Sequence, residues 1–109
     1  MKQVTLVALL AAAAMAAVSA QSSPNDQRAR EIFKELIEIN TTDSVGSVTK
    51  AAEAMAARLK AAGFADKDIQ VLGPDPRKHN LVARYHGTGA QRPLLLLAHL
   101  DVVEAKRED

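Results

Sequence analysis

The stretch Pro93-Leu94-Leu95-Leu96-Leu97-Ala98-His99-Leu100-Asp101-Val102-Val103 decides the fold that we expect for this chain of 109 residues. An uninterrupted apolar run after a proline is typical of a β-strand that is buried on both faces. Open α/β sheets built from such strands place ligands at the carboxyl ends of the strands. The run therefore predicts an α/β fold, with any chemistry at the end of this strand.

Two ionisable residues, His99 and Asp101, follow the leucine run. Side chains alternate across a strand, so these two point to the same side, about 7 Å apart at their Cα atoms. A carboxylate so placed can hydrogen-bond a metal-bound imidazole, which fixes its tautomer and raises its basicity. The same pair can also be solvated at a strand end, because His-x-Asp spacing arises easily by chance. The residues alone leave both interpretations open.

Two helices and two further strands are predicted before the leucine run. A serine–proline start and apolar residues at helical spacing indicate an amphipathic helix over residues 24–39. Ser47 as N-cap and Gly63 as terminator bound a second helix. Its predicted buried stripe is Val48, Ala51, Ala52, Met55, Leu59 and Ala62. Short strands over 69–72 and 80–86 follow, so the order is helix, helix, strand, strand, strand.

Three segments resemble the zinc-dependent exopeptidase and amidohydrolase family of aminoacylases, acetylornithine deacetylase, succinyl-diaminopimelate desuccinylase, glutamate carboxypeptidase and carnosine-type dipeptidases. The residues from Leu94 to Val103 are similar to its first metal-binding motif, Asn80–Arg84 to the preceding strand, and Lys60–Phe64 to a helix-to-strand corner. The resemblance spans roughly residues 27–109. It implies that residues 21–109 are the N-terminal portion of a mixed-sheet catalytic domain, incomplete in this chain.

The resemblance implies two zinc ions bridged by water and a carboxylate. In that arrangement His99 is a ligand to one zinc, and Asp101 is the carboxylate that orients His99 and counts as catalytic. The family's bridging aspartate, its general-base glutamate and its later ligands match no residue up to Asp109. Because catalytic zinc needs three protein ligands, the full-length form is expected to be the metallopeptidase or amidohydrolase, and this segment alone is expected to be inactive.

The first twenty residues are predicted to be a secretory signal peptide. Lys2 precedes an apolar core over residues 4–18, and Val18-Ser19-Ala20 supplies small residues for cleavage. The core is too short to span a bilayer comfortably. We therefore expect a secreted or periplasmic protein with no membrane association after cleavage; an uncleaved membrane anchor is the alternative.

Charge and cysteine content exclude some kinds of binding partner and metal ligand. Removing residues 1–20 takes away Lys2, which leaves 13 basic residues against 13 acidic ones and no net formal charge. No basic run is interleaved with aromatic residues, so nucleic acid is not an expected partner. The chain has no cysteine, which excludes disulfides and thiolate metal ligands within it.

The expected substrate is a small peptide or an N-acyl amino acid, and the resemblance permits a homodimer for the full-length form. Export favours a carboxypeptidase or dipeptidase over a biosynthetic deacylase. A small exported α/β binding module without catalysis remains the alternative. His79 and His86 are not expected to join His99 in a metal site, because their spacing puts them on opposite faces of a strand; both are expected as solvated loop residues.

Overall fold

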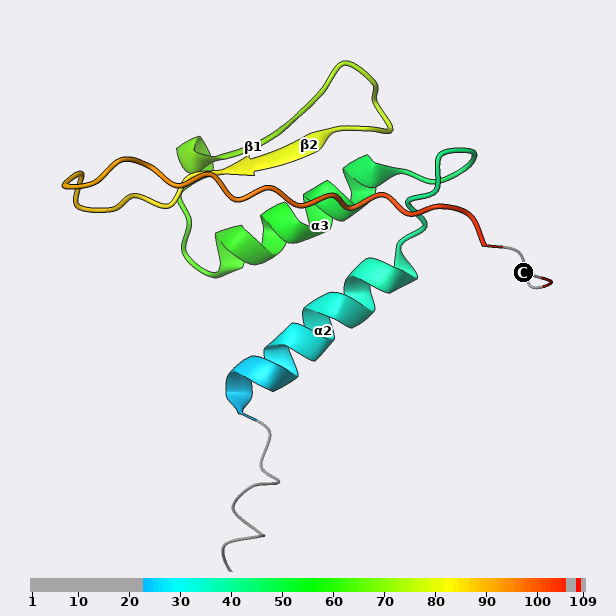
Figure 1. The fold of residues 1–109 in the computed structure, drawn as a ribbon, viewed down its shortest axis with the longest axis horizontal. Coiled ribbons are helices and arrows are strands. Elements are labelled where there is room, and N and C mark those ends of the chain that lie inside the picture. The colour runs from blue at the N-terminus through cyan, green and yellow to red at the C-terminus, as the bar shows by residue number, and fades with distance from the viewer. Residues whose placement is uncertain (1–22, 106–107, 109) are drawn as a thin grey trace, which may run out of the picture. The chain divides into compact units, whose positions relative to one another are not determined.

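The computed structural model describes residues 23–105 and residue 108. Its elements are α2 (Pro24–Glu38), α3 (Val48–Ala61), the 3-10 helix η1 (Asp66–Asp68), β1 (Ile69–Leu72) and β2 (Asn80–Ala83) (Figure 1). The α/β class is thus confirmed, with two helices and a two-stranded antiparallel sheet. The signal peptide predicted for residues 1–20 lies outside the described residues. Among those that are described, no helix has both the length and the apolar character that a membrane crossing requires.

The chain divides into two compact units, residues 1–34 and residues 35–109. In the first unit, the described residues form the start of α2. Ser23 Oγ accepts a hydrogen bond from the Asp26 backbone N–H at 3.1 Å, and the Asp26 carboxylate accepts one from the Ser23 N–H at 2.9 Å. This reciprocal pair satisfies two N–H groups at the helix start and explains why α2 begins where the sequence predicts.

The apolar face expected for α2 is not buried. None of its residues is buried, and the side chains of Phe33 and Ile37 are each 65% exposed. The bounds of the helix are therefore as predicted, within one residue, whereas the burial that its spacing predicts is wrong for the described residues. Local capping and propensity define α2, because an amphipathic stripe needs a packing partner before it is buried.

Helix α3 packs against both strands and forms the small core. Ser47 Oγ accepts a hydrogen bond from the Lys50 N–H at 3.4 Å, and Gly63 just beyond the helix has a φ of 95°. Both ends are as predicted, since a left-handed residue after a helix is the usual place for glycine. The buried residues are Thr49, Ala51, Ala52 and Ala56. Two of these lie in the predicted stripe, Thr49 and Ala56 were missed, and Ala62 is exposed.

The two strands form a hairpin in which Ile69 faces Ala83 and Leu72 faces Asn80. One more backbone hydrogen bond, from the Arg84 N–H to the Asp68 carbonyl at 2.9 Å, extends the pairing by one step. Ile69 is the buried strand residue and lies against α3. The strand predicted over residues 80–86 therefore ends earlier, at Ala83, where the partner strand has reached its own first residue.

The leucine run is the main correction to the predicted fold. Leu94 to Leu97 are 77–86% exposed, and residues 92–105 contain no helix or strand. Figure 1 shows this stretch, coloured orange to red, running extended past α3 and the hairpin. A buried strand needs a neighbour for its backbone and cover for both faces. Within residues 23–105 no backbone–backbone hydrogen bond provides that neighbour, so the run is extended but is not a strand.

Candidate functional site

Three segments of the second unit surround the candidate site: the 40–47 loop before α3, the 73–79 loop between the strands, and the C-terminal segment (residues 90–105). The 40–47 loop is closed by its own hydrogen bonds. Asn40 Oδ1 accepts the Thr42 N–H at 3.0 Å, the Gly46 N–H donates to the Thr42 carbonyl at 3.0 Å, and the Ser47 N–H donates to the Asn40 carbonyl at 2.9 Å. These hydrogen bonds fix the backbone of the loop and therefore the positions of its side chains.

The 73–79 loop is fixed to α3 through one buried threonine. Thr49 Oγ1 donates to the Pro76 carbonyl at 2.7 Å and accepts the His79 N–H at 2.9 Å. The Thr49 N–H also donates to the Arg77 carbonyl at 3.2 Å. A single residue at the start of α3 thus satisfies three backbone groups of the loop and sets its position.

We expect Thr49→Val to destabilise the chain by about 1–3 kcal/mol, because the Pro76 carbonyl and the His79 N–H lose their partner at a buried position. Urea unfolding followed by circular dichroism measures the loss. Thr88→Val is the matched control, since the Thr88 hydroxyl is exposed and accepts only one long contact, 3.5 Å from the Ala90 nitrogen. Equal unfolding midpoints for the two variants would contradict the role given to Thr49.

Arg77 joins the two loops. Its guanidinium donates from one nitrogen toward the carbonyls of Asp43, Ser44 and Gly46, at 3.3, 3.4 and 3.3 Å. A planar guanidinium can serve several acceptors in a fixed geometry, which a lysine ammonium does less well. Arg77 is therefore a cross-link between the loops, and its contacts are with backbone carbonyls of this chain.

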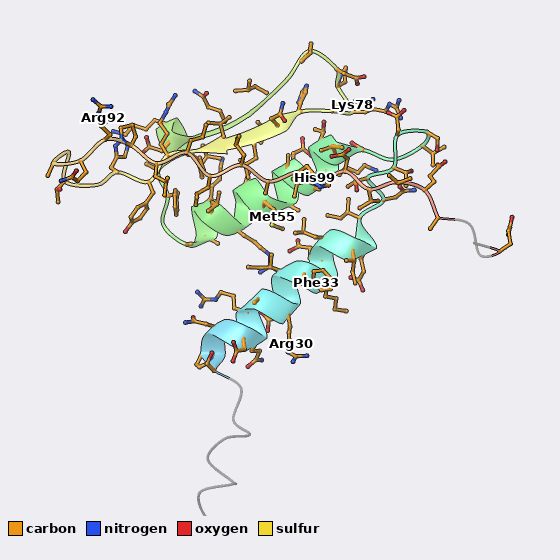
Figure 2. All side chains as sticks on the ribbon, viewed as in Figure 1. Arg30, Phe33, Met55, Lys78, Arg92 and His99 are labelled. Carbon is orange, nitrogen blue, oxygen red and sulfur yellow. The ribbon has the colours of Figure 1, made fainter. Side chains whose placement is uncertain are left out.

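Lys78 and Asp43 form an ion pair beside Arg77. Figure 2 shows Lys78 in the loop that leads into β2. The hydrogen bond and charge of Lys78 lower the pKa of the Asp43 carboxyl below its ordinary value of 3.8, and Arg77 adds a smaller effect in the same direction. The same bond raises the pKa of Lys78 above 10.5. Both groups are exposed, so the pair contributes little to stability.

We expect the Asp43 pKa to lie below 3.8 and to rise toward that value in Lys78→Gln. Because the folded-state pKa is lowered, the stabilisation from Asp43 is present above the unfolded value and is lost as pH falls through the folded one. Carboxyl-carbon NMR titration gives the measurement. Lys60→Gln is the control: it removes the partner that lowers the pKa of Asp66 and should leave Asp43 unchanged. An Asp43 pKa that ignores Lys78→Gln would contradict the assignment.

A pocket of about 700 Å³ opens between these segments. Its lining comes from residues 41–43, 46 and 48, from residues 77, 78 and 80, and from residues 101–104. The ionisable side chains on it are Asp43, Arg77, Lys78, Asp101 and Glu104. Both cationic side chains already have partners in this chain: Lys78 pairs with Asp43, and Arg77 bonds to backbone carbonyls. Asp101 lines the pocket and His99 does not.

The structure brings His99 and Asp101 together at the surface. His99 Nδ1 lies 3.0 Å from the Asp101 carbonyl oxygen and 3.3 Å from its carboxylate Oδ1. A carbonyl oxygen can only accept, so this hydrogen bond gives Nδ1 the donor role, and when the ring is neutral the lone pair lies on Nε2. The side chains are 85% and 66% exposed. The pair thus presents one free nitrogen to solvent, in the tautomer that a metal-binding histidine adopts when a carboxylate orients it.

The donor set for zinc is incomplete in this part of the chain. No group of three or more His, Cys, Asp or Glu side chains able to hold a metal ion occurs among residues 23–105 and 108. Catalytic zinc takes three protein ligands and an open position. The chemistry of His99 fits one such ligand, and the described residues do not supply the other two.

The remaining histidines, His86 and His79, have other neighbours. His86 Nε2 is 2.8 Å from Asp68 Oδ1, whose side chain is only 12% exposed. His79 is half-buried, and its backbone N–H bonds to Thr49. The prediction of solvated loop residues is confirmed for His86, whose side chain is 70% exposed beside Asp68, and holds in part for His79, which is a half-buried loop residue.

Comparison of the chain with protein-family models, with curated proteins and with solved structures gave no match. The resemblance of the segments around Lys60, Asn80 and His99 to zinc exopeptidases thus remains an expectation from their residues. Sequence reasoning missed the supports of the site, Thr41, Thr49 and Arg77. Their contacts join residues 27 to 59 positions apart, and no local spacing signals such pairs.

Proposed function

We propose that this chain carries the first metal-ligand motif of an exported zinc-dependent hydrolase that cleaves peptide or N-acyl amino acid amide bonds. The observation that carries the proposal is the contact of His99 with Asp101. One ring nitrogen faces two oxygens of Asp101, at 3.0 and 3.3 Å, and the other is free. An imidazole oriented in this way by an aspartate is what a metal ligand requires.

The residues of the pair have separate roles in this proposal. His99 offers its Nε2 lone pair, and Asp101 holds the proton at Nδ1, which fixes the ring and makes Nε2 a stronger donor. Zinc, when bound, would supply an acidified water and a positive charge for the developing oxyanion. Because the described residues provide one ligand, no hydrolytic step is assigned to this segment alone. The pocket beside Asp101 is the place where the substrate would lie.

The exposed leucine run supports a catalytic domain with further strands. Leu94 to Leu97 are 77–86% exposed and directly precede the pair. Soluble proteins seldom expose contiguous apolar patches of this kind without a partner. In the proposed enzyme, neighbouring strands would cover the run and would carry the other ligands on the same sheet edge.

Reading the coding sequence past Asp109 is the first test. We expect an aspartate soon after this position and then a pair of adjacent glutamates, with zinc-dependent hydrolysis by the complete product. Residues 21–109 alone should hydrolyse nothing. Zinc-dependent turnover by that segment, abolished by His99→Ala, would contradict the incomplete ligand set; a stop codon directly after Asp109 would remove the catalytic proposal.

The substrate class is testable on the complete product. Export places the enzyme among peptides rather than among cytosolic acylated intermediates, so we propose a carboxypeptidase or dipeptidase. Release of amino acids from dipeptides is compared with deacetylation of N-acetyl amino acids. If deacetylation alone occurs, the peptidase assignment falls and the amidohydrolase assignment stays.

A small exported binding module is the second candidate. The pocket of about 700 Å³ favours it, because a pocket lined by residues from within 41–48, 77–80 and 101–104 can hold a small ligand. Such a module should melt cooperatively as residues 21–109 and should bind no hydrophobic dye. Dye binding without a cooperative transition favours the enzyme segment, since it reports exposed apolar surface and loose packing.

A further inference from the structure

We infer that Thr41 is a positioning residue for the His99–Asp101 pair, an inference that rests on the proposed function for its meaning. Thr41 is 3% exposed, and its hydroxyl donates to the carbonyl of Leu100 at 2.9 Å. Leu100 is the residue between the two members of the pair. A buried side chain, 59 residues away in the sequence, therefore holds the peptide group that separates the candidate ligand from its carboxylate.

The C-terminal segment has few other attachments. Apart from the contact of Ala90 with nearby Thr88, two hydrogen bonds tie residues 90–105 to the rest of the described chain: the one from Thr41, and one from the Ser44 hydroxyl to the Glu104 carboxylate. The second joins exposed side chains. An exposed bond competes with water and fixes little, whereas the part-buried bond of Thr41 is more shielded from that competition. Thr41 is thus the main anchor of the segment near the pair.

Hydrogen bonds hold the loop that carries Thr41. Thr41 lies in the 40–47 loop, next to Asn40, whose side chain accepts both the N–H and the hydroxyl of Thr42, at 3.0 and 2.8 Å. Arg77 ties the far side of the same loop to the 73–79 loop. A hydroxyl fixed in this way can hold a partner carbonyl in one orientation, which a mobile loop could not.

Fixing the Leu100 carbonyl has a direct consequence for the pair. The carbonyl belongs to the planar peptide group between Leu100 and Asp101. When that plane cannot rotate, the N–Cα bond of Asp101 keeps its direction, which helps to keep the Asp101 carbonyl and carboxylate oxygens within reach of His99 Nδ1. Without the Thr41 bond the plane can turn, because no strand holds it, and His99 loses the acceptors that hold its tautomer.

The test compares Thr41→Val and Thr41→Ser in the full chain, with Ser44→Ala as control for the exposed attachment. Nitrogen-15 shifts of the His99 ring, measured where the imidazole is neutral, report which nitrogen carries the proton. We expect an Nδ1–H tautomer in the unmodified chain, its loss in Thr41→Val, and its retention in Thr41→Ser and Ser44→Ala. An unchanged tautomer in Thr41→Val overturns the inference.

Two further readouts keep the test decisive. Unchanged His86 signals, from the ring bonded to Asp68, report that each variant is folded. If Thr41→Val does not fold, nuclear Overhauser contacts between Thr41 and the Leu100–Asp101 amides are sought in the unmodified chain; their absence overturns the inference. Zinc affinity of the complete product should fall about 10–100-fold in Thr41→Val and be restored in Thr41→Ser.

Failure of the proposed function gives a different result. If zinc does not bind to the complete product while the His99 tautomer still depends on Thr41, the zinc hydrolase proposal fails and the positioning role stands. If zinc binds and His99→Ala removes it while Thr41→Val changes neither tautomer nor affinity, the positioning role fails and the hydrolase proposal stands.

Discussion

In the proposed zinc hydrolase, replacing His99 by alanine is expected to abolish zinc-dependent hydrolysis. The imidazole is 85% exposed, and the described residues hold no group of three or more potential ligands that could bind the metal without it. Loss of one of three protein ligands removes the metal or leaves it in the wrong geometry. Metal content after dialysis and turnover of a dipeptide, measured on the same preparation, provide the test.

Asp101→Asn should have a smaller effect than His99→Ala. The amide keeps the size of the side chain but removes the charge that orients the imidazole, which typically costs about 10–100-fold in metal affinity or activity. His86→Ala is the matched control, since His86 pairs with Asp68 and lies outside the pocket. Full activity of His99→Ala, or equal loss in His86→Ala, would refute the ligand assignment.

Gly46→Ala is expected to be the most disruptive small substitution in the 40–47 loop. A Cβ at this buried glycine would lie 2.4 Å from the Thr42 nitrogen, 2.6 Å from the Thr42 carbonyl oxygen and 2.7 Å from Asn40 Oδ1. Two of these atoms are backbone, so the loop itself must move. Overpacking of this kind costs about 1–3 kcal/mol, and it also displaces the Gly46 carbonyl that Arg77 contacts.

Urea unfolding measures the effect of Gly46→Ala, with an unchanged slope showing that stability alone has altered. Gly87→Ala is the control, because a Cβ there meets nothing within 4 Å and its φ is not positive. Surface changes of that type stay within about 0.5 kcal/mol. Equal urea midpoints for Gly46→Ala and Gly87→Ala would show that the 40–47 loop accommodates the added methyl group without loss of stability.

The parts of the fold that could be predicted are those whose signals are local. Capping at Ser23 and Ser47 and termination at Gly63 act over a single helical turn, so the bounds of α2 and α3 agree with the sequence. The exposure of Phe33 and of the leucine run could not be predicted from periodicity alone. Periodicity indicates which face is apolar but does not indicate whether another element packs against that face.

In the candidate site, too, only the features with a local sequence signal could be predicted. The common direction of His99 and Asp101 follows from the two-residue alternation of an extended chain, and the structure places their side chains together. The anchor at Thr41 and the cross-link at Arg77 depend on tertiary folding, which brings distant segments into contact. Neither threonine nor arginine at these positions has a sequence pattern of its own.

The exposed leucine run also has a consequence for how the chain behaves at high concentration. Leu94 to Leu97 form a short, uncharged and extended stretch with free backbone hydrogen-bonding groups, which is the type of segment that stacks into cross-β fibrils. Pro93 interrupts such stacking on one side, and the charge of Asp101 opposes it on the other. These two residues therefore act as gatekeepers of the run, and neutralising Asp101 should promote fibril formation as well as altering the site.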